Sequence, residues 1–229
     1  MLEIRPASVD SLLILLGERA DPATSARVAA ATALIRRELA PILIDLVPSY
    51  ASILLSFDLR RDSVAALSRR LESLLQDLNP DAAIQGAGRL VTLPVWYDPQ
   101  VGPDLETLAQ RHDMTVAKLI DLHVSPEYRV YAIGFSPGFG YLGDVDPRIA
   151  TPRRDTPRTS VPAGSVALAE RQTAVYPQAT PGGWHVLGRC PLTLFDASAA
   201  PYLSIQVGDR VRFEPIAEAE YRRLLEVRA

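Results

Sequence analysis

The sequence predicts an α+β protein that is divided into two domains. Over about the first ninety residues, apolar runs with the spacing of strands alternate with runs that have the spacing of helices. After them, short strand-like runs are separated by proline and glycine every few residues. The stretch PDAAIQGAGR at 80–89 lies between the two patterns and favours a linker. We therefore expect a small α/β domain at residues 1–88 and a β-rich domain at residues 89–229.

The first domain is predicted from the order of its elements. Short apolar runs indicate strands, and apolar residues spaced three and four apart indicate two amphipathic helices. Asp21 and Pro22 are typical of a helix N-terminus. In chain order the expected elements are strand 11–16, helix 21–39, strands 42–47 and 51–57, helix 62–78 and strand 89–98. This β-α-β-β-α-β order is the split βαβ, or ferredoxin-like, arrangement.

The second domain is predicted to be a β-barrel or a sandwich. Two short helical stretches at 104–113 and 115–124 precede the strand YRVYAIGF at 128–135. Five further strand-like pieces follow, namely GSVALA, TAVYP, WHVLG, LTLFD and DRVRFEP. Regularly punctuated short strands of this kind are typical of barrels and sandwiches.

Composition excludes several classes of function. The net charge of −3 provides no field for binding nucleic acid. No apolar run reaches the roughly 20 residues that span a bilayer, so we expect no membrane role. The N-terminus MLEIRPASVD lacks the pattern of a signal peptide, and the single cysteine, Cys190, excludes an internal disulfide. These features predict a cytoplasmic protein.

Common catalytic motifs are absent from the sequence. It contains no phosphate-binding G-x-x-x-x-G-K-[ST] loop, and Gly86 and Gly88 lack the third glycine of a dinucleotide site. It has no G-x-S-x-G serine elbow, and its three histidines lack zinc-like spacing, so we expect no metal. Nucleotide-dependent chemistry would therefore need an unfamiliar site or a partner chain.

Three segments concentrate glycine, proline and aromatic residues in the second domain. They are GFSPGFGYLG at 134–143, PRTSVPAGSVALAERQTAVYP at 157–177 and TPGGWHVLGRCPLTLFD at 180–196. In this order they resemble the 5-oxoprolinase subunit PxpB family, also described as KipI-type or allophanate hydrolase subunit 1 proteins, which are carboxyltransferase-like. Two positions depart from the family pattern: Gly140 stands where proline is usual, and Cys190 stands where threonine is usual.

The resemblance implies both a fold and an activity. The second domain would be a cyclophilin-like β-barrel. The chain would be a subunit, inactive alone, of an ATP-dependent enzyme that cleaves 5-oxo-L-proline to L-glutamate. Its partners would be a PxpC/KipA-type chain and a PxpA-type chain, with ATP bound in the assembled complex and not necessarily by this chain.

Candidate site residues follow from the resemblance and from side-chain chemistry. His185 has the pKa range for relaying a proton or orienting a lactam carbonyl, and Arg189 and Arg158 can hold a carboxylate or phosphoryl group. We expect His185 and Arg189 to be catalytic. Substrate-binding residues are expected at Pro137, Gly138, Phe139, Tyr141, Arg158, Pro162, Gly164, Ser165, Gln172 and Gly183. For each of these, the residue types alone equally permit a structural role.

Two other functions remain open at this stage. A KipI-type protein would bind and inhibit a sensor histidine kinase, with a proline-containing segment of the kinase held against Phe139 and Tyr141. A subunit of urea or allophanate metabolism would differ from a 5-oxoprolinase only in the amide that it acts on.

Overall fold

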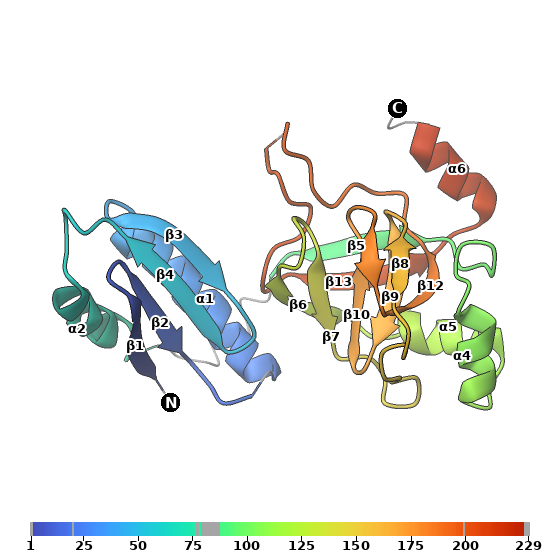
Figure 1. Ribbon diagram of the computed structural model, residues 1–229, viewed down its shortest axis with the longest axis horizontal. Coiled ribbons are helices and arrows are strands. Elements are labelled where there is room, and N and C mark those ends of the chain that lie inside the picture. Colours follow the sequence, from blue (N-terminus) through green and yellow to red (C-terminus); the bar gives the residue numbers. More distant parts are fainter. Residues whose placement is uncertain (1, 20, 77, 79–87, 199, 227–229) are drawn as a thin grey trace. The chain divides into compact units, whose positions relative to one another are not determined.

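The chain forms two compact units, Met1–Gly88 and Arg89–Ala229. The computed structural model describes residues 2–19, 21–76, 78, 88–198 and 200–226, and most of the expected linker lies outside them (Figure 1). None of the helices within these ranges is long and apolar enough to cross a membrane.

The first unit is an antiparallel sheet covered by helices. Its elements are β1 (Glu3–Ser8), β2 (Ser11–Leu15), α1 (Pro22–Leu39), β3 (Leu43–Pro48), β4 (Ser52–Phe57) and α2 (Val64–Leu75). The strand order is β1-β2-β4-β3, and every neighbouring pair is antiparallel. This is the order of a split βαβ sheet, but its edge strand comes first in the chain. The expected strand at 89–98 therefore does not belong to this sheet, and β1 takes its place.

One core holds the first unit together. Alternate residues of β2 and β4, including Leu12, Ile14 and Leu55, are fully buried. They pack against the apolar faces of both helices, represented by Ile35 of α1 and Leu71 of α2. The two helices share this core because both lie on the same face of the sheet. The side chain of Asp21 accepts a hydrogen bond from Thr24 N, and this cap fixes the start of α1 as the sequence predicts.

The second unit is a nearly closed barrel. Its seven-stranded sheet has the order β12-β9-β10-β7-β6-β13-β5, in which β13 and β5 run parallel. Trp96, directly after β5, and Arg189, the last residue of β12, exchange two backbone hydrogen bonds of 2.9 Å. The two edge strands therefore meet at this point. The strands are β5 (Leu90–Val95), β6 (Tyr128–Ile133), β7 (Gly140–Gly143), β9 (Ser165–Ala169), β10 (Gln172–Val175), β12 (His185–Arg189) and β13 (Arg210–Pro215).

Further elements surround the barrel sheet. β8 (Arg158–Val161) and β11 (Thr180–Gly182) form a separate two-stranded ladder, and the helices are α4 (Leu105–Arg111), α5 (Val116–Val124) and α6 (Glu218–Glu226). The helices α4 and α5 are expected from the sequence, whereas α6 was not among the expected elements. The expected strand LTLFD is wrong, because only Phe195 within it forms an isolated bridge, to Leu203.

The barrel strands have two buried faces. Val166 and Leu168 of β9 belong to the main core, which also contains residues of α4 and α5. Ala167 and Ala169 point to the opposite face and belong to a second core. We call this second core the aromatic core; its buried members are Phe139, Val161, Ala167, Ala169, Ala174, Tyr176, Trp184 and Val186.

Candidate functional site

The loop before β7 contains a tight turn made by Pro137 and Gly138. Phe139 N donates to Ser136 O over 3.0 Å, and Gly138 has a φ of 83° at the third turn position. A type II turn needs a positive φ there and favours proline one residue earlier. A side chain at position 138 would also bring its Cβ within 2.7 Å of Phe195 Cβ. The turn therefore explains the Pro-Gly pair, and it directs Phe139 into the aromatic core.

A second turn of the same kind precedes β9. Ser165 N donates to Pro162 O over 3.2 Å, and Gly164 has a φ of 78°. A Cβ at position 164 would lie 2.5 Å from Cys190 O and 3.0 Å from Arg189 Cδ. Only glycine fits, and its absence of a side chain lets Arg189 pass close to the turn.

The aromatic core gathers side chains from distant segments. Phe139 packs edge to face on Tyr176 and Trp184, with ring centroids 5.2 and 5.6 Å apart. Tyr141 packs on Phe139 at 5.0 Å. Phe135 lies 5.2 Å from Phe139, yet it is 62% exposed and has a φ of 70°. A bulky side chain in this left-handed region is strained, and strain of this kind gathers at functional sites.

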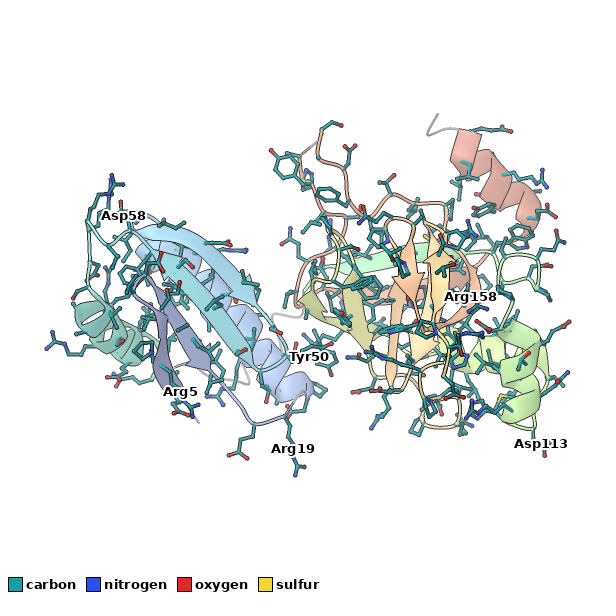
Figure 2. The ribbon with its side chains drawn as sticks, viewed as in Figure 1. Arg5, Arg19, Tyr50, Asp58, Asp113 and Arg158 are labelled. Atoms are coloured by element: carbon teal, nitrogen blue, oxygen red, sulfur yellow. The ribbon has the colours of Figure 1, made fainter. Side chains whose placement is uncertain are left out.

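Asp104 is the centre of a buried ion-pair network. Its side chain is 6% exposed and accepts bidentate hydrogen bonds of 2.8 and 2.9 Å from Arg158. Arg154 Nη1 and the backbone amide of Val186 each donate to it over 2.7 Å. Burial alone would raise the pKa of Asp104, but these hydrogen bonds and the two positive charges lower it overall. Arg158, labelled in Figure 2, is therefore held by Asp104.

Sequence reasoning did not identify Asp104. An aspartate just before a helix is usually its N-cap, but Asp104 makes no side-chain capping bond to α4. The only signal in the sequence is the group of three arginines near residue 155, which needs a counter-charge. Nothing in the spacing says that the counter-charge comes from about fifty positions earlier in the chain.

The two residues expected to be catalytic lie on opposite faces of β12. His185 is paired with Leu168 and Arg189 with Ser165 on the adjacent strand β9. Leu168 belongs to the main core, whereas Ser165 shares its face with Ala167 of the aromatic core. The sheet therefore does not bring the two side chains together.

The environments of these two residues differ. His185 is 8% exposed, and its Nε2 lies 2.8 Å from Pro152 O. A carbonyl only accepts, so Nε2 carries the hydrogen, and in the neutral ring Nδ1 keeps the lone pair. Arg189 is half-buried, and its Nε has no partner among the described residues.

The other candidate residues are distributed along the same strands. Gln172 is paired with Ala169, at the end of β9 away from Ser165. Four residues of strand separate those two ends by about 13 Å. Gly183 O accepts from Arg154 N over 2.8 Å, which ties the loop before β12 to the arginine loop. Gln172 is thus separated from Ser165 and Arg189, while Gly183 lies beside the Asp104 network.

The two departures from the family pattern have structural settings. Gly140 is paired with Ile133 between β6 and β7, and a Cβ there would lie 2.5 Å from Ile205 Cδ1. Cys190 is 2% exposed, and its backbone amide donates to Gly164 O over 2.8 Å. Gly140 thus belongs to a strand ladder, and Cys190 holds the turn before β9 through its backbone.

The fold and these turns define the chain first as a carboxyltransferase-type domain: residues 2–205 match the family described as carboxyltransferase domain, subdomain C and D. The chain is 35% identical over 229 residues to the B-type subunit of 5-oxoprolinase from Bacillus subtilis (strain 168), covering 96% of this chain and 95% of that protein. It therefore belongs to the 5-oxoprolinase subunit PxpB family.

Solved structures share this fold. The crystal structure of TTHA0988 superimposes with a TM-score of 0.80 at 36% identity, over 92% of this chain and 40% of that chain. This chain therefore spans less than half of TTHA0988. The Kluyveromyces lactis urea carboxylase superimposes with a TM-score of 0.72 over 98% of this chain and 22% of its own, at 19% identity, which is a likeness of fold alone.

Proposed function

We propose that this chain is the PxpB-type subunit of an ATP-dependent 5-oxoprolinase that opens 5-oxo-L-proline to L-glutamate. The observation that carries the proposal is the 35% identity to a protein named as a 5-oxoprolinase subunit, which extends over nearly the full length of both chains. The barrel contributes one part of the substrate site, and we take it to be of the cyclophilin-like kind that the sequence resemblance implies.

The partners are a PxpC/KipA-type chain and a PxpA-type chain. The naming of the relative as one subunit of its enzyme supports an assembly of several chains. ATP phosphorylates the amide oxygen and so activates the amide carbon; water adds to that carbon, the C–N bond breaks with the nitrogen taking a proton, and a second water hydrolyses the resulting acyl phosphate to L-glutamate and phosphate. Arg154 and Arg158 already bind Asp104, so they are poor candidates for the phosphates of ATP. We therefore assign the ATP site to a partner chain.

The two residues on opposite faces of β12 take different roles in this proposal. Arg189 has no carboxylate within ion-pair distance among the described residues, which leaves its charge available for substrate. His185 binds Pro152 O and so fixes the loop that carries Arg154. We therefore place Arg189 against the substrate and keep proton relay by His185 Nδ1 as the expectation to be tested.

The test is glutamate release from 5-oxoproline and ATP. It compares this chain alone, the partner chains alone and the complete mixture, with Arg189→Ala, His185→Ala and the control Arg171→Ala in the mixture. Arg171 is 60% exposed and lies outside the site. We expect activity only in the mixture, a loss of at least about 100-fold for Arg189→Ala, and no change for Arg171→Ala. A stable complex without glutamate release would refute 5-oxoproline as the substrate.

A further inference from the structure

Ser165 and Arg189 form a polar pair at the edge of the aromatic core. They lie directly opposite each other in the antiparallel register of β9 and β12. Directly opposed residues project from the same face, with Cβ atoms about 5 Å apart. Ala167 and Val186, the neighbouring pair on this face, both belong to the aromatic core. The two polar side chains therefore lie side by side on this face.

Each member of the pair has a buried polar atom without a partner. Ser165 is 0% exposed, and its Oγ forms no hydrogen bond with any described residue. Arg189 Nε is equally buried and equally unpaired within the described part of the chain. Buried donors are normally paired, because losing water without gaining a partner is unfavourable. Two such atoms on one face indicate a missing acceptor.

The charge of Arg189 is also uncompensated by any described residue. Arg154 and Arg158, the other half-buried arginines near this face, are both bound to Asp104. Within the ranges that the structure describes, Arg189 makes no salt bridge. The missing acceptor is therefore expected to carry negative charge.

The surrounding backbone fixes this geometry. Gly164 N donates to Tyr176 O over 2.7 Å, and Cys190 N donates to Gly164 O over 2.8 Å. These bonds hold the turn against the end of β12, and the missing Cβ of Gly164 leaves space for Arg189 Cδ. The pair is therefore built into a rigid part of the barrel.

We propose that Ser165 and Arg189 bind the carboxylate of the substrate, so that the amide acted on must carry a carboxylate group. This inference rests on the proposed function and narrows its substrate class. A guanidinium group and a hydroxyl donor match the two oxygens of a carboxylate. A neutral amide such as urea leaves both donors unpaired, and sites that bind a polar group reject analogues that lack it.

A carboxylate fits this pair better than a phosphoryl group does. Phosphate sites usually combine side chains with several free backbone amides. Here the amide of Gly164 already donates to Tyr176 O, and the amide of Ser165 donates to Pro162 O. Two side-chain donors remain, which suits two carboxylate oxygens.

The test follows the ¹⁵N–¹H signal of Arg189 Nε in the full chain by NMR. Arg189→Lys assigns the signal by removing it, and Arg171→Lys is the exposed control. The ligands are 5-oxoproline, 2-pyrrolidinone, which is the same lactam without the carboxylate, and inorganic phosphate. We expect a saturable shift with 5-oxoproline and none with 2-pyrrolidinone. Arg189→Lys and Ser165→Ala should each weaken 5-oxoproline binding by about 10- to 100-fold.

Several results would overturn the carboxylate site. The first is an Arg189 signal that 5-oxoproline does not move, either in the chain alone or in the complex with its partner chains. The others are an equal shift with 2-pyrrolidinone, and a shift with phosphate but not with 5-oxoproline. The proposed function is judged separately, by glutamate release. A carboxylate-specific shift without glutamate release would leave the site standing and refute the function. If Arg189→Lys and Ser165→Ala both left glutamate release unchanged, the carboxylate site would be refuted and the proposed function would stand.

Discussion

Replacing Asp104 by alanine is expected to destabilise the second unit more than any nearby surface change. The substitution leaves the guanidinium groups of Arg154 and Arg158 and the amide of Val186 without their acceptor. The three groups lose four hydrogen bonds of 2.7, 2.8, 2.9 and 2.7 Å. Asp155, the residue directly after Arg154, is exposed and provides the matched control.

The size of the effect follows from the burial of the partners. Removing one member of a buried ion pair costs about 3–5 kcal/mol. The side chains of Arg154 and Arg158 are 33% and 23% exposed, so water can partly replace the lost carboxylate. We therefore expect the lower end of that range, about 3 kcal/mol, for Asp104→Ala. Asp155→Ala should stay within about 0.5 kcal/mol of the natural chain.

Urea unfolding followed by tryptophan fluorescence measures this difference. Both tryptophans, Trp96 and Trp184, lie in the second unit, so the signal reports that unit alone. With a urea dependence of about 2 kcal/mol per molar, the midpoint for Asp104→Ala should fall by about 1.5 M. Because the folded pKa of Asp104 is lowered, its stabilising effect is present above the ordinary value of 3.8 and is lost as the pH falls below it. Equal midpoints for Asp104→Ala and Asp155→Ala would refute the network as a source of stability.

Two further predictions concern the barrel. Gly164→Ala should lower the free energy of unfolding of the second unit by about 1–3 kcal/mol, because of the positive φ and the contact with Cys190 O. Gly134→Ala, where a Cβ meets nothing within 4 Å, is its control in the same urea assay, and equal loss in both would contradict the argument. Burial lowers the pKa of His123 to about 3, so this residue is neutral in the folded state and takes up a proton on unfolding below pH 6.5. Stability should therefore fall by about 1.4 kcal/mol for each unit of pH below about 6.5, and a His123→Gln variant that kept this slope would assign it to another group.

Much of the fold could be predicted from local patterns, and the largest error lies in a long-range pairing. The helix α1 and the strands β2 and β4 have apolar spacing that is readable over a few residues. The strand β5 was placed in the wrong sheet because its parallel partner, β13, is about 120 positions further along the chain. The segment EIRPAS of β1 mixes charge and proline at an exposed sheet edge, so it lacks the alternation that reveals a strand.

The turns of the site were easier to predict than its charges. Gly138 and Gly164 were named as site residues through the family resemblance, and their positive φ at the third turn position gives a physical reason for glycine at both. Asp104 was not identified, because its ion pair with Arg158 forms only when the barrel brings the two distant segments together. The exposure and left-handed backbone of Phe135 also depend on the three-dimensional arrangement of the loop.

A β-bulge in β12 explains why His185 and Arg189, four residues apart, lie on opposite faces. Simple alternation along a strand would place positions 185 and 189 on one face, because they are four residues apart. The register shifts between Val186 and Gly188, however, so Leu187 is an extra residue and the alternation reverses after it. Bulges re-aim side chains in this way and are common beside active sites. The bulge therefore turns Arg189 away from the face of His185 and towards Ser165, on the face of the sheet that carries the aromatic core. If Leu187 were deleted, the ladder would become regular with the same four pairs, and His185 and Arg189 would be three positions apart and still on opposite faces. Arg189 would therefore be expected to stay opposite Ser165, and carboxylate binding should survive the deletion.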